Sequence, residues 1–162
     1  MTLFNMSRLL DVAKLRRGLA PGQRLIGLDP GARTIGVALS DVGLTLASPY
    51  GSLRRGKLAT NAAEIRAIAE KEDAGGLVVG LPLSMDGTAG RAAQAARDWA
   101  HAIMVATGLP AALFDERLTT EAVNRMLIEE ADLSRKRRAK VVDRMAAARI
   151  LQAALDASGR PG

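Results

Sequence analysis

Three short apolar runs lie close together early in the chain, and they constrain the fold more than any other feature. The runs have the length of strands, and turns of three or four residues join them, at 24–29, 34–40 and 44–50. Connections this short permit antiparallel pairing, whereas a parallel crossover needs a dozen or more residues. We therefore expect the core to open with an antiparallel meander.

Helical and apolar segments alternate through the rest of the chain. The run "GLVVGLP" (76–82) is continuously apolar, which indicates a strand buried on both faces beside a parallel neighbour. Asn61, with Glu64 three residues later, forms a capping-box pattern that predicts a helix start. The remaining elements that we expect are helices at 61–74, 91–106, 119–133 and 140–157, and a strand at 109–118. The order β-β-β-α-β-α-β-α-α predicts an α/β fold, with a mixed five-stranded sheet and helices on both faces.

Length and composition predict one soluble domain. A chain of 162 residues, 48% of them hydrophobic, can bury a single core. We expect residues 1–23 to form an N-terminal extension with a short amphipathic helix, and residues 24–162 to form the domain. The absence of cysteine fits a reducing compartment, and no secretory signal or membrane-spanning run is present. The expected location is the cytoplasm, with no membrane partner.

Positive charge predicts a polyanionic partner. The chain has 23 Lys and Arg residues against 17 acidic residues, a net charge of +6, and its cations cluster at 14–18, 53–57 and 135–140. Five cations in the last six-residue cluster repel one another unless an anion lies nearby. This charge favours nucleic acid as the partner. A basic surface that serves only solubility is the alternative, and the oligomeric state, monomer or dimer, stays open.

Three acidic residues occupy positions where an unpaired charge is costly. Asp29 ends an apolar strand, and Glu116 lies near the end of another. Asp143 shares a helix face with apolar Ile150. A buried carboxylate costs several kcal/mol unless it is paired or bound to a cation. Each acid also has a structural alternative, which is a turn at Asp29, a surface ion pair at Glu116, and a helix cap or ion pair at Asp143.

Together the three acids form a candidate metal site. Carboxylates from two strands and a helix can share one or two Mg²⁺ or Mn²⁺ ions, which prefer oxygen ligands. Two such ions can activate a water and hold a phosphodiester in line. Rival chemistries have little support, because the chain has no cysteine, one histidine (His101) and no Walker-type phosphate loop.

Four motifs together closely resemble the YqgF family, whose members are described as Holliday junction resolvases or pre-16S rRNA nucleases. The motifs are "GLDPGARTIGVALSD", "VVGLPLSMDGT", "DERLTT" and "VVDRMAAARILQAALD", and the resemblance covers residues 24–157. It implies a ribonuclease H-like fold for the domain. It also implies that Asp29, Glu116 and Asp143 are the catalytic, metal-binding acids.

The function that we expect is a metal-dependent nuclease that processes the 5′ end of pre-16S rRNA. A resolvase of four-way DNA junctions is the runner-up, because it would need the same acids. Two other classes are a non-catalytic nucleic-acid-binding factor, which the acids disfavour, and an ATP-binding fragment related to actin-like kinases, which would need a second domain. The candidate phosphate contacts are Arg33, Arg117, Arg135, Lys136, Arg137, Arg138 and Lys140.

Overall fold

The computed structural model describes residues 9–81, 89–115 and 135–159, with the side chains at 89 and 135–144 excepted. Its centre is a five-stranded sheet in the order β3-β2-β1-β4-β5. The strands are β1 (Arg24–Pro30), β2 (Thr34–Ser40), β3 (Ala47–Arg54), β4 (Ala74–Leu81) and β5 (Ala111–Asp115). The described helices are α1 (Val12–Arg17), α2 (Leu58–Glu72), α3 (Ala89–Thr107) and α5 (Arg135–Ser158).

The pairing of the strands confirms the expected mixed sheet. β1 pairs antiparallel with β2, and β2 pairs antiparallel with β3, which gives the meander. β1 pairs parallel with β4, and β4 pairs parallel with β5. β1 is therefore the strand at which the antiparallel and parallel halves of the sheet meet.

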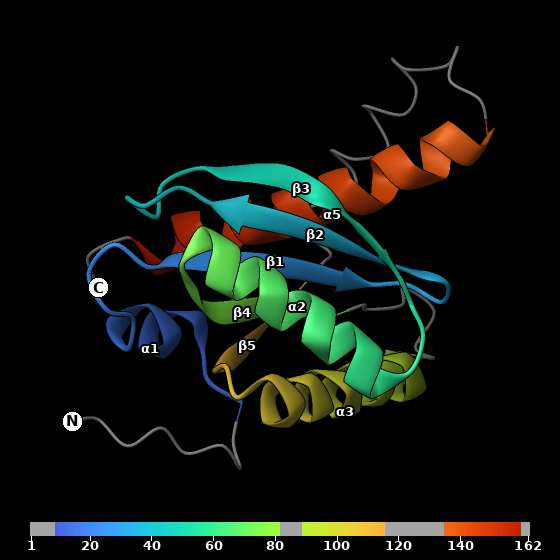
Figure 1. The fold of residues 1–162 in the computed structure, drawn as a ribbon, viewed down its shortest axis with the longest axis horizontal. Coiled ribbons are helices and arrows are strands. Elements are labelled where there is room, and N and C mark those ends of the chain that lie inside the picture. The colour runs from blue at the N-terminus through green and yellow to red at the C-terminus, as the bar shows by residue number, and fades with distance from the viewer. Residues whose placement is uncertain (1–8, 82–88, 116–134, 160–162) are drawn as a thin grey trace.

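Helices cover both faces of the sheet, as expected (Figure 1). On one face, side chains of α2 and α3 such as Ile65 and Ile103 pack against Ile26 and Leu28 of β1. On the other face, α1 packs against β4 and β5, and α5 packs mainly against β2 and β3 and also against β1, with Leu151 buried in that layer. β1 is apolar on both sides because it lies between these two cores.

Three elements begin three or more residues away from the start that the sequence predicts. β3 begins at Ala47 rather than at 44, because the Asp41 carboxylate accepts the N–H groups of Thr45 and Leu46 and holds this segment in a turn. α2 begins at Leu58, so Asn61 lies inside the helix and is not its N-cap, although its side chain does donate to Glu64. α5 begins at Arg135, five residues before the expected start. The expected helix at 119–133 lies outside the described residues.

The described part of the N-terminal segment packs against the sheet. Val12 and Leu15 of α1 are buried, and Leu10 forms a parallel bridge with Ala112 of β5. Arg16 donates to the carbonyl of Leu155 in α5 at 3.0 Å. The division of the chain at residue 24 stays a prediction. Within the described ranges, no helix is long and apolar enough to cross a membrane.

Candidate active site

Asp29 lies at the end of β1, where the chain turns back into β2. It is half-buried, and it pairs with Gly36 across the antiparallel ladder. The following turn is closed by the Gly31 N–H, which donates to the Thr34 carbonyl at 2.8 Å. The carboxyl ends of β1, β4 and β5 meet at this edge of the sheet, because the three strands are parallel. Such an edge is where sheets of this class hold their ligands.

The alternation of side chains places Asp29 on the α5 face of the sheet. Leu25 packs in the α1/α5 core, whereas Ile26 and Leu28 pack in the α2/α3 core. Successive strand residues point to opposite faces, so Leu25, Gly27 and Asp29 share the face that α5 covers.

Gly27 is the point at which α5 approaches β1 most closely among the glycines described. A Cβ atom at Gly27 would lie 2.8 Å from the Cβ atom of Leu151 and 3.1 Å from the carbonyl oxygen of Ala147. Only a glycine permits this approach, since any side chain would overlap the helix. This contact sets the distance between α5 and β1.

The direction of α5 brings Asp143 toward the same edge. The end of α5 lies at the start of β1, beside α1, so the helix runs antiparallel to β1 (Figure 1). From Gly27, Asp29 is two residues along the strand, a rise of about 6–7 Å. From Ala147, Asp143 is four residues back along the helix, a rise of about 6 Å in the same direction. The two acids therefore occupy matching levels on elements that contact each other.

The structure describes the third acid and the basic candidates only in part. β5 ends at Asp115, which pairs with Leu81 of β4, and Glu116 and Arg117 lie outside the described residues. Arg33 lies in the β1–β2 turn and is exposed. The segment 135–140 forms the first turns of α5, which extends beyond the edge where β1 ends (Figure 1).

Arg55 ties the turn after Asp29 to two other elements. Its guanidinium donates to the carbonyl oxygen of Gly31 at 2.7 Å and lies 5.6 Å from the ring centroid of Trp99 in α3. Its backbone N–H donates to the carbonyl of Arg33 at 2.8 Å. These contacts hold the turn in place beside Asp29.

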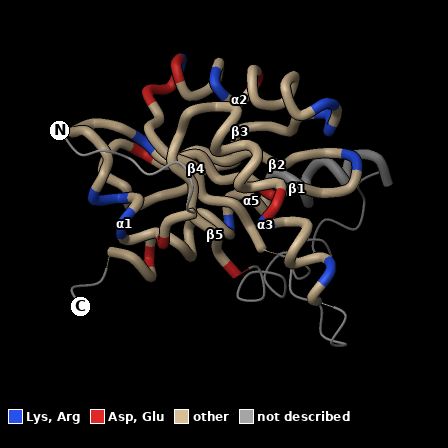
Figure 2. The backbone as a smooth tube through the Cα atoms, turned by 90° about the horizontal axis from the view of Figure 1, so that it is seen from below, with Lys and Arg blue, Asp and Glu red and all other residues tan. Residues whose placement is uncertain are grey.

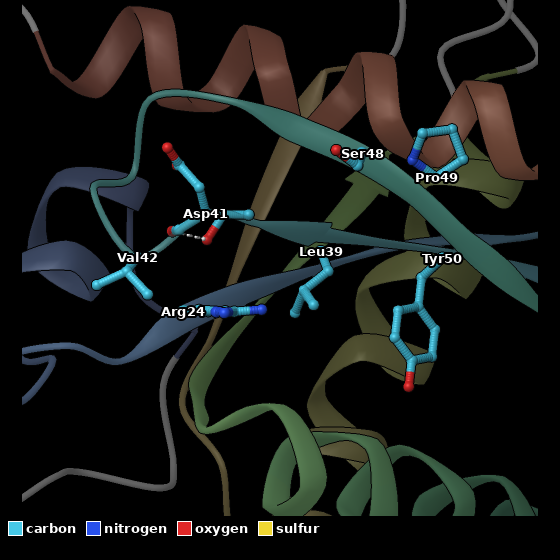
Figure 3. Close-up of a pocket in the computed structure, with 8 residues that line it drawn as sticks. Arg24, Leu39, Asp41, Val42, Ser48, Pro49 and Tyr50 are labelled. Atoms are coloured by element: carbon cyan, nitrogen blue, oxygen red, sulfur yellow. Dashed lines mark hydrogen bonds between the residues drawn. The ribbon is translucent and has the colours of Figure 1, made fainter.

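A pocket of ≈ 460 Å³ lies at the opposite end of β1, lined by Arg24, the end of β2 and the start of β3 (Figure 3). Its acid, Asp41, accepts hydrogen bonds from the N–H groups of Leu46 and Thr45, which hold the pKa of Asp41 below its ordinary value. The Tyr50 hydroxyl donates to Glu72, which raises the pKa of Tyr50. Both groups are committed to local structure, so this pocket does not compete with the edge at Asp29 as a catalytic site.

The described side chains include no group of three that could hold a metal ion. Of the three candidate acids, only Asp29 belongs to that described set. His101 is exposed on α3.

Two features near Asp29 were not assigned to a site from the sequence. Arg54 and Lys57 belong to the basic cluster at 53–57, and the pairing of Arg54 with Thr34 brings that cluster to the Asp29 edge. The signal for Gly27 was its place inside an apolar strand, which often marks a close backbone approach.

Curated relatives match nearly the whole chain. A protein of Gluconacetobacter diazotrophicus named "Putative pre-16S rRNA nuclease" is 61% identical over 158 residues, which cover 98% of this chain and 99% of that protein. A protein of Acidiphilium cryptum with the same name is 58% identical over 161 residues, with 99% and 98% covered.

A solved structure and a family model agree with this fold. The structure of RuvC from T. thermophilus in complex with a Holliday junction substrate has a TM-score of 0.52 and 16% identity, over 85% of this chain and 96% of that one. This likeness shows a shared fold. The RuvX model, described as Holliday junction resolvase, matches residues 23–157. The chain therefore belongs to the RuvX family, the family expected from its motifs under the name YqgF.

Proposed function

We propose that this protein is a metal-dependent nuclease that hydrolyses phosphodiester bonds in structured nucleic acid, with the 5′ end of pre-16S rRNA as its substrate. The observation that carries the proposal is the placement of Asp29 at the carboxyl end of β1, level with Asp143 on the helix that covers it. The names of relatives that are 61% and 58% identical support RNA as the substrate. The basic charge of the chain supports a polyanion.

Three acids would hold the metal in this proposal: Asp29, Glu116 and Asp143. Glu116 follows Asp115, the last residue of β5, directly in the sequence. Carboxylates are the ligands that Mg²⁺ and Mn²⁺ prefer, and the chain has no cysteine to favour a softer metal. When bound, such ions stabilise the charge that develops on the phosphodiester and make water a better nucleophile.

The surrounding residues would orient the acids and the substrate. The contact of Gly27 with Ala147 and Leu151 holds the two elements that carry Asp29 and Asp143 at a fixed spacing. Arg55 restrains the β1–β2 turn through the Gly31 carbonyl. These restraints matter because a displacement of about 1 Å in a catalytic group can cost about 100-fold in rate.

The proposal is tested with the Asp29→Asn variant on a precursor 16S rRNA fragment that carries its 5′ leader. We expect cleavage in Mg²⁺ or Mn²⁺, none in EDTA, and a loss on the order of 100-fold or more in the variant, because even outer-sphere metal partners cost about 10–100-fold. Asp98→Asn is the matched control, since Asp98 is an exposed acid of α3 bonded only to Gln94 among the interactions described for it. Equal cleavage by the wild type and Asp29→Asn would sink the proposed site.

A four-way DNA junction is the second candidate substrate, because the family model is described as Holliday junction resolvase. The same proteins and metals are used on a junction of four DNA strands. Cleavage of the junction without cleavage of the RNA would replace RNA with DNA in the proposal. In either case Asp29 is expected to be required, since both reactions hydrolyse a phosphodiester.

A further inference from the structure

The segment that follows β3 is held firmly although its side chains are exposed. Asn61, buried near the start of α2, accepts the Gly56 N–H at 2.9 Å and donates to the Arg54 carbonyl at 3.0 Å. On its other side, the Arg55 N–H donates to the Arg33 carbonyl at 2.8 Å. The backbone at 54–57 is thus fixed both to α2 and to the β1–β2 turn.

Within this segment, Arg54 lies on the face of the sheet where Asp29 lies. Arg54 pairs with Thr34, and Gly36, two residues further along β2, pairs with Asp29. Because Leu53 packs in the α2/α3 core, Arg54 belongs to the opposite, α5 face, which it shares with Asp29. Two strand spacings of about 4.8 Å and two residues of rise put the Cα atoms of Arg54 and Asp29 roughly 12 Å apart.

Two further cations adjoin Arg54, namely Arg33 in the β1–β2 turn and Lys57 directly before α2. All three are exposed. The ion pairs identified among the described side chains, Arg24–Glu72 and Arg66–Glu70, do not involve them.

Among the described residues, acidic groups are sparse around these cations. The first turn of α2 has no acidic residue, and the carboxylate of Glu64 accepts a hydrogen bond from Asn61. Blue segments mark the β1–β2 turn and the start of α2, whereas red segments gather at the far end of α2 (Figure 2). Glu70 and Glu72 of α2 therefore lie at the far end of the helix from these cations, together with Lys71.

We propose that Arg33, Arg54 and Lys57 form a phosphate-binding surface, here called the hairpin-edge surface, that holds the nucleic-acid backbone beside the cleaved bond. The proposal rests on the proposed nuclease function. A separation of roughly 12 Å between the Cα atoms of Arg54 and Asp29 lets one nucleic-acid strand reach both residues. The surface holds the substrate at that distance from Asp29. Phosphate contacts fix position without reading sequence, which suits an RNA recognised by shape.

The test compares two double variants that remove the same charge. Arg54→Gln/Lys57→Gln alters the hairpin-edge surface, and Lys14→Gln/Arg17→Gln removes one exposed Lys and one exposed Arg from α1, at the other end of the molecule. Binding of a labelled precursor-rRNA hairpin is measured in EDTA, which prevents cleavage, at several KCl concentrations. We expect the first variant to lower the slope of log affinity against log salt by roughly 1.4–1.8, at about 0.7–0.9 per lost phosphate contact. Its affinity near 0.1 M salt should fall on the order of 10-fold, while the α1 variant keeps the wild-type slope.

Equal slopes for the two double variants would overturn the hairpin-edge surface. The nuclease proposal can fail separately. If the wild type never cleaves the RNA but its binding depends on the hairpin-edge surface as expected, the catalytic proposal is wrong and the surface stands. Thermal unfolding checks that each variant is folded. If the double variant does not fold, Lys57→Gln decides alone, because Lys57 makes no side-chain cap to α2 and a slope change of about 0.7–0.9 is expected from it.

Discussion

Replacing Gly27 with alanine would insert a methyl group between β1 and α5. That methyl would lie 2.8 Å from the Leu151 Cβ atom and 3.1 Å from the Ala147 carbonyl oxygen. Carbon atoms in contact are normally about 3.5–4.0 Å apart, so the two elements must separate by roughly 1 Å. Neither contacted atom is the end of a flexible side chain, so the backbone of α5 has to move.

The change in the free energy of unfolding on Gly27→Ala is the sum of two opposing terms. Overpacking of a filled core costs about 1–3 kcal/mol, whereas a change from glycine to alanine restricts the unfolded chain and returns about 0.4–1 kcal/mol. Gly51→Ala in β3 supplies only the second term, because nothing lies within 4 Å of a Cβ atom there. The difference between the two variants is therefore about 1–3 kcal/mol. In a chain of this length it corresponds to a difference in Tm of roughly 2–12 °C.

The assay is thermal unfolding followed by circular dichroism, with cleavage of the precursor rRNA measured on the folded protein. We expect Gly27→Ala to unfold at a lower temperature than Gly51→Ala and to lose on the order of 100-fold in cleavage. Equal Tm values would refute the close contact of α5 with β1. A lower Tm with wild-type cleavage would refute the argument that this contact sets the position of Asp143.

Two further predictions concern local structure. Asn61→Ala leaves the Gly56 N–H and the Arg54 carbonyl without their side-chain partner, so we expect a loss of roughly 1–3 kcal/mol in urea unfolding; the exposed change Gln94→Ala is the control, and equal losses would contradict the reasoning. The lowered pKa of Asp41 means that its carboxylate stabilises the turn before β3 above about pH 3.8, and that this contribution is lost as the pH falls through the lower pKa of the folded state. NMR titration of the carboxyl group should give a midpoint below 3.8, and a midpoint at or above that value would show that the hydrogen bonds to Thr45 and Leu46 do not form in solution.

The antiparallel meander and a parallel neighbour for β4 followed from the sequence, because short turns and a continuous apolar run leave few alternatives. The order of the strands within the sheet came from the structure. The start of β3 did not follow, because the apolar letters at 44–46 look like a strand. The decisive interactions there are hydrogen bonds to one side chain, Asp41. The pattern of apolar residues in the sequence carries no record of such a contact.

The candidate site was predictable in its residues but not in its spacing. Asp29 and Asp143 stood out as acids in apolar surroundings, and such surroundings can be recognised from the neighbouring residues in the sequence. Their matching levels depend on where α5 crosses β1, and that crossing is set by the absence of a side chain at Gly27. Arg33 of the hairpin-edge surface was named from the sequence as a phosphate contact, but Arg54 and Lys57 were not. Arg54 approaches Asp29 only through the register of two successive strand pairs.

The close approach at Gly27 also acts as a fulcrum for α5. A tilt of the helix by about 10° around that point shifts the backbone at Asp143, about 6 Å away, by roughly 1 Å. The same tilt shifts the start of the helix at Arg135, about 18 Å away, by roughly 3 Å. A substitution that tilts α5 would therefore move its basic beginning about three times as far as Asp143, the acid nearest the fulcrum.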